Sequence, residues 1–130
     1  MARDESSGTI KLFESAGGLI RALENGATIM IDELDNSMHP LMTRFLVNLF
    51  HNKDPNLHSA QLIFTTHDTT LLDKDLFRRD QVWFIEKQDG MSNLYSLLDY
   101  SPRKEEALER GYLQGRYGAI PFICTFNSKN

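Results

Sequence analysis

Two short apolar runs, each ending abruptly in polar side chains, are the feature that most constrains the fold of this chain. Residues 27–31 and 61–66 are rich in β-branched and other apolar side chains, and an amphipathic segment at residues 40–50 separates them. Short apolar runs are typical of buried strands, and a helix that connects two strands of one sheet makes them parallel. The sequence therefore predicts a β-α-β unit within an open α/β sheet.

Polar side chains follow both predicted strands at their carboxyl ends. Asp32 and Glu33 follow the first strand, and His67 follows the second. In open α/β sheets, ligands bind outside the carboxyl ends of the strands. The three side chains would supply that edge with a metal ligand, a general base and a polar sensor, which together suggest nucleotide hydrolysis. The structural alternative is that the acidic pair solvates a strand end and favours the next helix N-terminus, and that the histidine only supports the fold.

A helix is predicted before the first strand. Apolar residues recur at helical spacing over residues 9–23, and Asn25-Gly26 is a typical helix stop. Ser6 and Ser7 precede this helix as candidates for its N-terminal cap.

The second half of the chain changes its pattern. Two strand-like runs flank Gln88-Asp89-Gly90, a typical hairpin signal, so the sheet is expected to turn antiparallel there. The expected fold is thus a mostly parallel sheet with an antiparallel hairpin and flanking helices. The other segments predicted here are a short helical stretch at 69–77, strands at 81–87 and 93–98, a charged helix at 102–111 and an irregular stretch at 111–121.

Composition excludes several classes of protein. The 130 residues are 41% apolar and 25% charged, as in an ordinary globular domain. No apolar run approaches the roughly 18–20 residues that span a bilayer, and no signal core follows Met1, so a cytoplasmic protein without membrane contact is expected. The single cysteine, Cys124, excludes a cysteine metal cage, so that a metal would be held by carboxylate oxygens. The net charge of −4 does not predict nucleic-acid binding.

The order of these motifs carries a family resemblance. Ser-Ser-Gly-Thr at residues 6–9 opens a helix, the helix leads to the strand Ile29-Met30-Ile31-Asp32-Glu33, and a second strand ends in His67. This order resembles the ABC-type ATPase domains, and more closely the prokaryotic AAA-family proteins with that core, which include phage-defence ATPases. The resemblance runs from about Glu5 to Ile123 and implies a P-loop NTPase-like fold.

The resemblance implies a role for each matched residue. Residues 29–33 match the Walker B motif, in which Asp32 would hold Mg²⁺ through water and Glu33 would deprotonate the attacking water. His67 matches the switch histidine, which would contact the γ-phosphate of ATP. The implied cofactors are therefore ATP and Mg²⁺, with Glu33 and His67 as catalytic residues.

The resemblance also implies a dimer. Ser6, Ser7 and Gly8 match the signature motif, which binds the γ-phosphate of a nucleotide held by the opposite subunit, although a plain helix cap is the alternative. The implied partner is a second copy, arranged head to tail around two ATP molecules, and an effector protein would be a further partner. His39 takes the place of the usual aspartate of the segment that couples the two sites, and its alternative role is to cap the next helix. We derive no role for Arg78, Arg79 or residues 111–121.

One expected motif is missing from the sequence. Gly-x-x-x-x-Gly-Lys-Ser/Thr, the Walker A loop that cradles the phosphates, does not occur. Residues 1–130 are therefore expected to be a single partial domain, the C-terminal lobe of a longer ATPase. The intact protein would be an ATP hydrolase, whereas this chain alone should not hydrolyse ATP efficiently, because phosphoryl transfer depends on positioning and electrostatics.

Two other functions remain open from the sequence. The chain could be a non-catalytic module that uses the ATPase core shape for dimerisation or for binding a partner. It could also be a metal-dependent nuclease in which Asp32 and Glu33, with Asp35 or Asp68, hold two cations.

Overall fold

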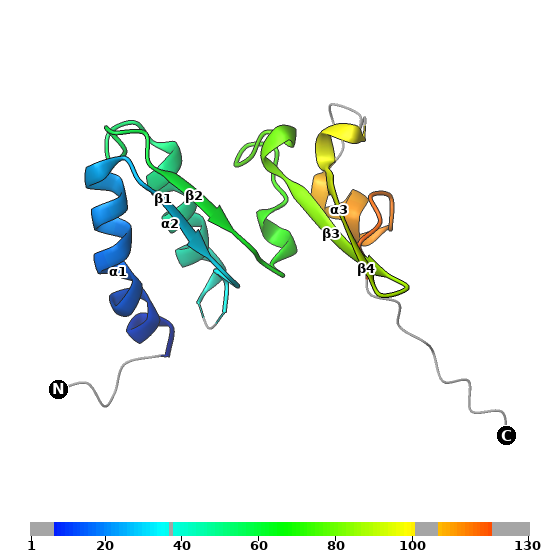
Figure 1. Cartoon of the computed structure of the whole chain (residues 1–130), viewed down its shortest axis with the longest axis horizontal. Helices are drawn as coiled ribbons and strands as arrows, with labels where there is room; N and C mark the ends of the chain where they lie inside the picture. The colour runs from blue at the N-terminus through cyan, green and yellow to red at the C-terminus, as the bar shows by residue number, and fades with distance from the viewer. Residues whose placement is uncertain (1–6, 37, 101–106, 121–130) are drawn as a thin grey trace, which may run out of the picture. The chain divides into compact units, whose positions relative to one another are not determined.

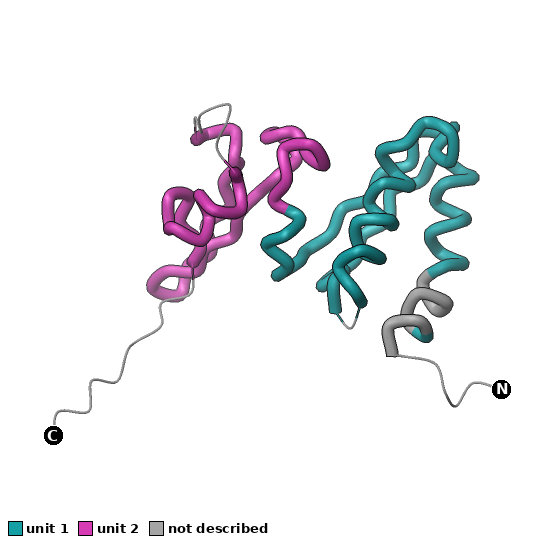
Figure 2. Tube along the Cα trace, turned by 180° about the vertical axis from the view of Figure 1, so that it is seen from behind, with its two compact units in different colours: residues 1–71 teal, residues 72–130 magenta. Residues whose placement is uncertain are grey.

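The computed structural model describes residues 7–36, 38–100 and 107–120, and it divides the chain into two compact units. Unit 1 comprises residues 1–71 and unit 2 comprises residues 72–130 (Figure 2). Within the described ranges, none of the helices combines the length and the apolar character that crossing a bilayer requires. The single partial domain expected over residues 1–130 stays a prediction, and each unit is described by itself below.

Unit 1 contains the predicted β-α-β arrangement (Figure 1). Strand β1 (Thr28–Ile31) pairs in parallel with strand β2 (Gln61–Phe64), and helix α2 (Pro40–His51) connects them. Helix α1 (Ser7–Asn25) precedes β1, and a 3-10 turn, η1 (Thr69–Leu71), follows β2. The predicted α/β fold is confirmed, and β2 ends two residues earlier than the apolar run suggested.

Local sequence signals explain where the two helices begin and end. Gly26 adopts a φ of +66°, and the N–H of Ala27 donates to the carbonyl oxygen of Ala22 at 3.0 Å, which is the Schellman end of a helix. His39 is the N-cap of α2, where its Nδ1 accepts from the N–H of Leu41 at 3.2 Å. Pro40 occupies the first helical position. Its lack of an N–H costs nothing there, because an N–H at that position has no acceptor within the helix.

The parallel pair is covered unevenly. Ile29 and Leu62 are opposite each other in the register and only half-buried, and Ile29 Cδ1 lies 3.7 Å from where a Cβ of Gly18 in α1 would stand. Met30 and Ile63, the next pair in the register, belong to the other face and are 75% and 50% exposed. Parallel sheets are ordinarily covered on both faces, so this apolar face is unusual.

Unit 2 is built on the predicted hairpin. Strand β3 (Trp83–Gln88) pairs antiparallel with strand β4 (Met91–Ser96), and the two-residue turn Asp89-Gly90 has φ values of 51° and 80°, as in a type I′ turn. Two 3-10 turns, η2 (Arg79–Gln81) and η3 (Leu97–Asp99), flank the strands, and helix α3 (Leu108–Leu113) follows. Among the described residues, the hairpin and the parallel pair are separate two-stranded sheets, so the expectation that one sheet turns antiparallel at the hairpin is wrong.

The core of unit 2 gives the 111–121 stretch a structural role. Tyr117 is 3% exposed and packs with Phe84, Leu97 and Leu108. The hydroxyl of Tyr95 donates to the Tyr117 carbonyl oxygen at 2.7 Å. The stretch therefore supplies an aromatic side chain to the core of the hairpin.

Three helical predictions differ from the structure in detail. Of the helical stretch expected at 69–77, only the 3-10 turn η1 forms, because Asp68 and Asp73 accept backbone N–H groups two residues ahead and hold the chain in local turns. The charged helix expected at 102–111 falls partly outside the described residues, and its described part, α3, continues to Leu113. Ser7 is already helical, whereas Ser6, the other cap candidate, lies outside the described residues.

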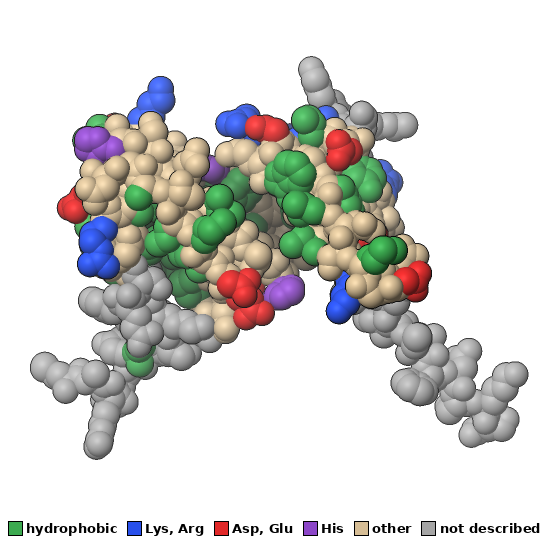
Figure 3. All heavy atoms as spheres, viewed as in Figure 1, with side chains coloured by type: hydrophobic (Ala, Val, Ile, Leu, Met, Phe, Trp, Pro, Cys, Tyr) green, Lys and Arg blue, Asp and Glu red, His purple; other side chains and the backbone are tan. Residues whose placement is uncertain are grey.

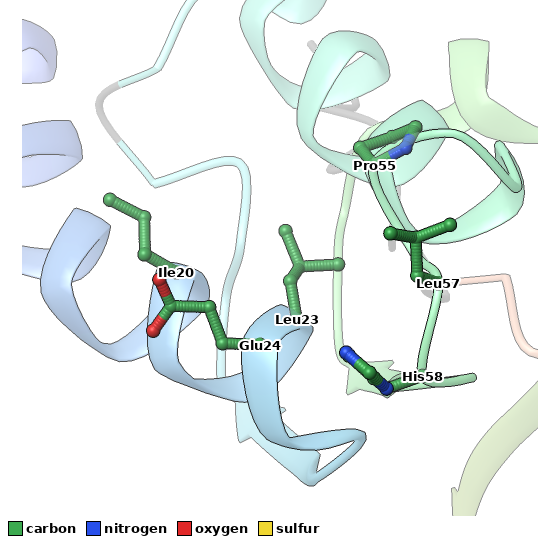
Figure 4. Close-up of a pocket in the computed structure, with 6 residues that line it drawn as sticks. All are labelled: Ile20, Leu23, Glu24, Pro55, Leu57 and His58. Carbon is green, nitrogen blue, oxygen red and sulfur yellow. The ribbon is translucent and has the colours of Figure 1, made fainter.

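A shallow pocket of about 280 Å³ lies between the end of α1 and the loop that precedes β2 (Figure 4). This region belongs to the amino ends of the two strands, because α1 ends just before β1 begins. The pocket is lined by Ile20, Leu23, Glu24, Pro55, Leu57 and His58.

Replacing Gly26 with alanine should destabilise unit 1 by about 2–4 kcal/mol, because the left-handed φ is strained for alanine and the added Cβ would lie too close to a backbone oxygen. That Cβ would stand 2.3 Å from the carbonyl oxygen of His58. Urea denaturation measures the effect. Gly17→Ala is the matched control, because a Cβ at position 17 meets no described atom within 4 Å. This substitution should stabilise α1 by about 1 kcal/mol, since alanine has the higher helix propensity. Equal effects of the two substitutions would contradict this account of Gly26.

Candidate functional site

The carboxyl ends of β1 and β2 bring the predicted acidic and histidine side chains together. Glu33 Oε1 lies 3.7 Å from His67 Nε2, although the two residues are 34 positions apart in the chain. Figure 3 shows acidic and histidine side chains gathered at this end of unit 1. The expected proximity of Glu33 and His67 is therefore confirmed.

Thr65 connects the acidic pair to the second strand end. Its hydroxyl donates to Oδ1 of Asp32 and accepts from the backbone N–H of Glu33 at 2.8 Å. The backbone continues the parallel pairing, since Thr65 N–H donates to the Ile31 carbonyl oxygen at 3.1 Å and Leu34 N–H donates to the Thr65 carbonyl oxygen at 3.0 Å. Thr65 is not among the residues predicted from the sequence, and the register explains its place, because it lies one step beyond the last paired residues, Ile31 and Phe64, opposite Asp32.

The sequence suggests Asp35 only as a metal ligand of the nuclease alternative. In the structure, this residue fixes the segment that carries His67. Its Oδ1 accepts from the His67 backbone N–H at 3.3 Å, and the Thr66 hydroxyl also hydrogen-bonds to the carboxylate. Partial burial alone would raise the pKa of Asp35. The hydrogen bonds from Thr66, from its own backbone and from His67, with the charge of His67, outweigh burial and hold that pKa below its ordinary value.

Glu33 occupies an unusual backbone conformation. Its φ is 50°, in the left-handed region that a residue with a Cβ adopts only at a cost of about 1–2 kcal/mol. A turn holds it there, because the Asn36 N–H donates to the Glu33 carbonyl oxygen at 2.9 Å, and Leu34 beside it is 2% exposed. Asn36 Nδ2 also donates to Glu33 Oε2 at 3.3 Å. Strain of this kind is common where a backbone is held for function.

The donor set at the strand ends fits a hard cation. Asp32 and Thr65 present carboxylate and hydroxyl oxygens, and Mg²⁺ is ordinarily held by one or two carboxylates while it keeps several waters. Among the residues that the structure describes, no group of three or more His, Cys, Asp and Glu side chains is arranged to hold a metal ion. The side chains of Glu33 and His67 are 51% and 85% exposed, so the site is open to solvent on this chain.

The other described residues of the predicted site, Ser7 and Gly8, lie at the start of α1. This first turn of α1 lies at the same end of unit 1 as the carboxyl end of β1 (Figure 1). Ser6 falls outside the described residues. His39 caps α2, as its alternative interpretation expected.

Thr65→Val should destabilise unit 1 by about 1–2 kcal/mol, because it keeps the β-branched shape but removes the acceptor of the Glu33 N–H and the donor to Asp32. Thr65→Ser keeps the hydroxyl and should stay within about 0.5 kcal/mol of the parent chain. Urea denaturation compares them with Thr28→Val, a matched change on β1 whose hydroxyl makes only a 3.4 Å contact with Gln61. An equal cost at positions 28 and 65 would rule out a special role of the Thr65 hydroxyl.

The lowered pKa of Asp35 should make its contribution to stability depend on pH. The ionised carboxylate stabilises the folded state above the ordinary pKa of 3.8, and this contribution is lost as the pH falls through the lower pKa of the folded state. The difference in the free energy of unfolding between the parent chain and Asp35→Asn should therefore be constant above about pH 5 and shrink below about pH 4. Urea denaturation at several pH values measures it. A difference that is unchanged at about pH 3 would contradict the prediction.

Comparison with known proteins identifies the family of the first part of the chain. A family model described as "AAA domain, putative AbiEii toxin, Type IV TA system" matches residues 2–73, more than half of the 130 residues. No curated protein and no solved structure matches the chain. The matched residues contain α1, both parallel strands and the site at their ends. The chain therefore belongs to the family described as "AAA domain, putative AbiEii toxin, Type IV TA system", and residues 2–73 are an AAA-type, ATPase-like region.

Proposed function

We propose that this chain supplies the Walker B and switch-histidine part of an ABC-type ATP-hydrolysing site. The observation that carries the proposal is the 3.7 Å approach of Glu33 Oε1 to His67 Nε2 across the ends of two parallel strands. The match to an AAA-type family supports nucleotide binding as the general chemistry. The phage-defence role that the resemblance implies rests on that resemblance alone.

Each side chain has a distinct task in this proposal. Glu33 orients the attacking water and takes its proton, and its side chain is 51% exposed and so accessible to water. His67 donates toward the γ-phosphate oxygens and stabilises the negative charge as the phosphoryl group is transferred. Asp32 holds Mg²⁺ through water, and Thr65 fixes the Asp32 carboxylate. When bound, Mg²⁺ neutralises charge on the phosphates.

The site is composite in this proposal. The sequence has no Walker A loop, so the groups that cradle the phosphates belong to another polypeptide segment. The uncovered face of the parallel pair, where Met30 is 75% exposed, supports the same conclusion, because it offers such a segment an apolar surface on which to pack. Ser7 and Gly8 at the start of α1 act in trans on nucleotide held by a second copy, which makes a head-to-tail dimer part of the mechanism.

Glu33→Gln should abolish turnover while ATP stays bound. In an assembly that contains this chain and a Walker A segment, we expect kcat to fall by about 10²–10⁴-fold, because the amide accepts no proton but keeps the shape of the side chain. Steady-state hydrolysis measures turnover, and equilibrium binding of ATP measures retention. Glu24→Gln is the matched control, since Glu24 lies on α1 at the opposite end of unit 1 and lines the pocket there.

Normal turnover by the Glu33→Gln assembly would overturn the role of Glu33. Calorimetry on this chain alone provides a second criterion, because a composite site requires the phosphate cradle. The chain alone should give little or no heat with Mg-ATP, and tight binding would show that its phosphate site lies elsewhere on this chain.

A further inference from the structure

We propose that Asp35 is a positioning residue that ties the segment after β1 to the segment after β2 and thereby holds His67 beside Glu33. The inference rests on the proposed function for its catalytic consequence, whereas its structural part is testable on this chain alone. Asp35 itself has no assigned place in the chemistry of the site.

The contacts of Asp35 extend to three consecutive residues of the segment after β2. The His67 N–H donates to Asp35 Oδ1 at 3.3 Å, and the Thr66 hydroxyl hydrogen-bonds to the same carboxylate. The Thr66 oxygen in turn accepts from the Asp68 N–H at 3.0 Å. One carboxylate therefore fixes Thr66 and His67 directly and Asp68 through the threonine hydroxyl.

The bonds continue beyond Asp68 into the next turn. Asp68 Oδ1 accepts from the N–H of Thr70 at 2.9 Å and from its hydroxyl at 2.6 Å. The Thr70 carbonyl oxygen accepts from Arg44 of α2 at 3.4 Å. The segment that carries His67 is thus connected at one end to the segment after β1 and at the other end to α2.

His67 depends on this support because its own side chain is poorly packed. The imidazole is 85% exposed, so its position follows from its backbone. The Glu33 side chain is also exposed, and its left-handed φ of 50° is maintained by the turn that runs from Glu33 to Asn36. Asp35 belongs to that turn and binds the His67 backbone, so it relates the two exposed side chains to each other.

The electrostatics agree with this geometry. The hydrogen bonds to Asp35 lower the pKa of its carboxyl group below the ordinary value, so the group is ionised near neutral pH. Hydrogen bonds to an ionised acceptor are stronger than those between neutral groups. A small displacement of a catalytic group can reduce turnover by about 10²-fold, so a positioning residue affects the chemical step more than nucleotide affinity.

The structural part is tested by NMR on the 130-residue chain. Asp35→Leu removes the acceptor, Asp35→Asn retains one, and Asp54→Leu in the exposed loop before β2 is the matched control. We expect Asp35→Leu to remove the nuclear Overhauser contact between the His67 ring and the Glu33 side chain. Exchange of the His67 amide hydrogen should rise about tenfold, as expected for one lost hydrogen bond. Asp35→Asn should keep the contact and most of the protection.

Two outcomes would overturn the inference. One is an Asp35→Leu chain that keeps both the contact and the protection of the His67 amide. The other is an Asp35→Asn chain that loses them as fully as Asp35→Leu, which would exclude the acceptor as the cause. If Asp35→Leu fails to fold, Thr66→Val replaces it, because valine keeps the shape and removes the hydroxyl bond to Asp35. Thr66→Val should also accelerate exchange of the His67 amide, and unchanged exchange would count against the proposal.

The kinetic part uses the ATP-hydrolysing assembly. Asp35→Leu should lower kcat by about 10–100-fold with less than a twofold change in the KM for ATP, and Asp35→Asn should recover most of the loss. Equal changes in kcat and KM for Asp35→Leu would contradict a positioning role. If Glu33→Gln leaves turnover normal, the proposed function fails, whereas the NMR arm still decides whether Asp35 holds His67 beside Glu33.

Discussion

The parallel pairing of β1 with β2 is the constraint on which the rest of unit 1 depends. It brings residues more than thirty positions apart into register, with Ile31 opposite Phe64, and places the two chain exits side by side. Side-chain hydrogen bonds extend the connection between the two strands beyond the backbone pairing. One step past the last paired residues, the Thr65 hydroxyl binds Asp32 and the Glu33 N–H. The positions of the side chains in such a site are set mainly by the paired strands rather than by the loops that carry them.

The same pairing explains why the site is open. A two-stranded sheet can organise one edge, but it cannot enclose a triphosphate, and Glu33 and His67 remain substantially exposed. Exposed charges interact weakly through water, so the catalysis proposed for this site would need a partner that excludes solvent. The apolar face at Met30 and Ile63 lies on the same strands and gives such a partner a surface on which to pack.

Strong local signals made much of the fold predictable from the sequence. Gly26 ends α1, and Asp89-Gly90 forms the hairpin turn, because a left-handed conformation favours particular residues. The proximity of Glu33 and His67 followed from the rule for parallel strand ends. The support around them did not follow, because threonine and aspartate after a strand fit many local turns, and only the final register shows that Thr65 and Asp35 reach across. The place of Tyr117 in the core of unit 2 was likewise not predictable from the sequence, since residues 111–121 have no periodic pattern.

The left-handed backbone at position 33 limits what can replace the glutamate there. β-Branched side chains are especially disfavoured at positive φ, whereas glycine and asparagine adopt it readily and glutamine matches the glutamate in size. If Glu33 has the proposed catalytic role, a related chain without hydrolysis is expected to carry one of those three residues rather than valine or isoleucine. Such a protein would keep the fold, and under the proposed function residue 33 alone would indicate that its activity is lost.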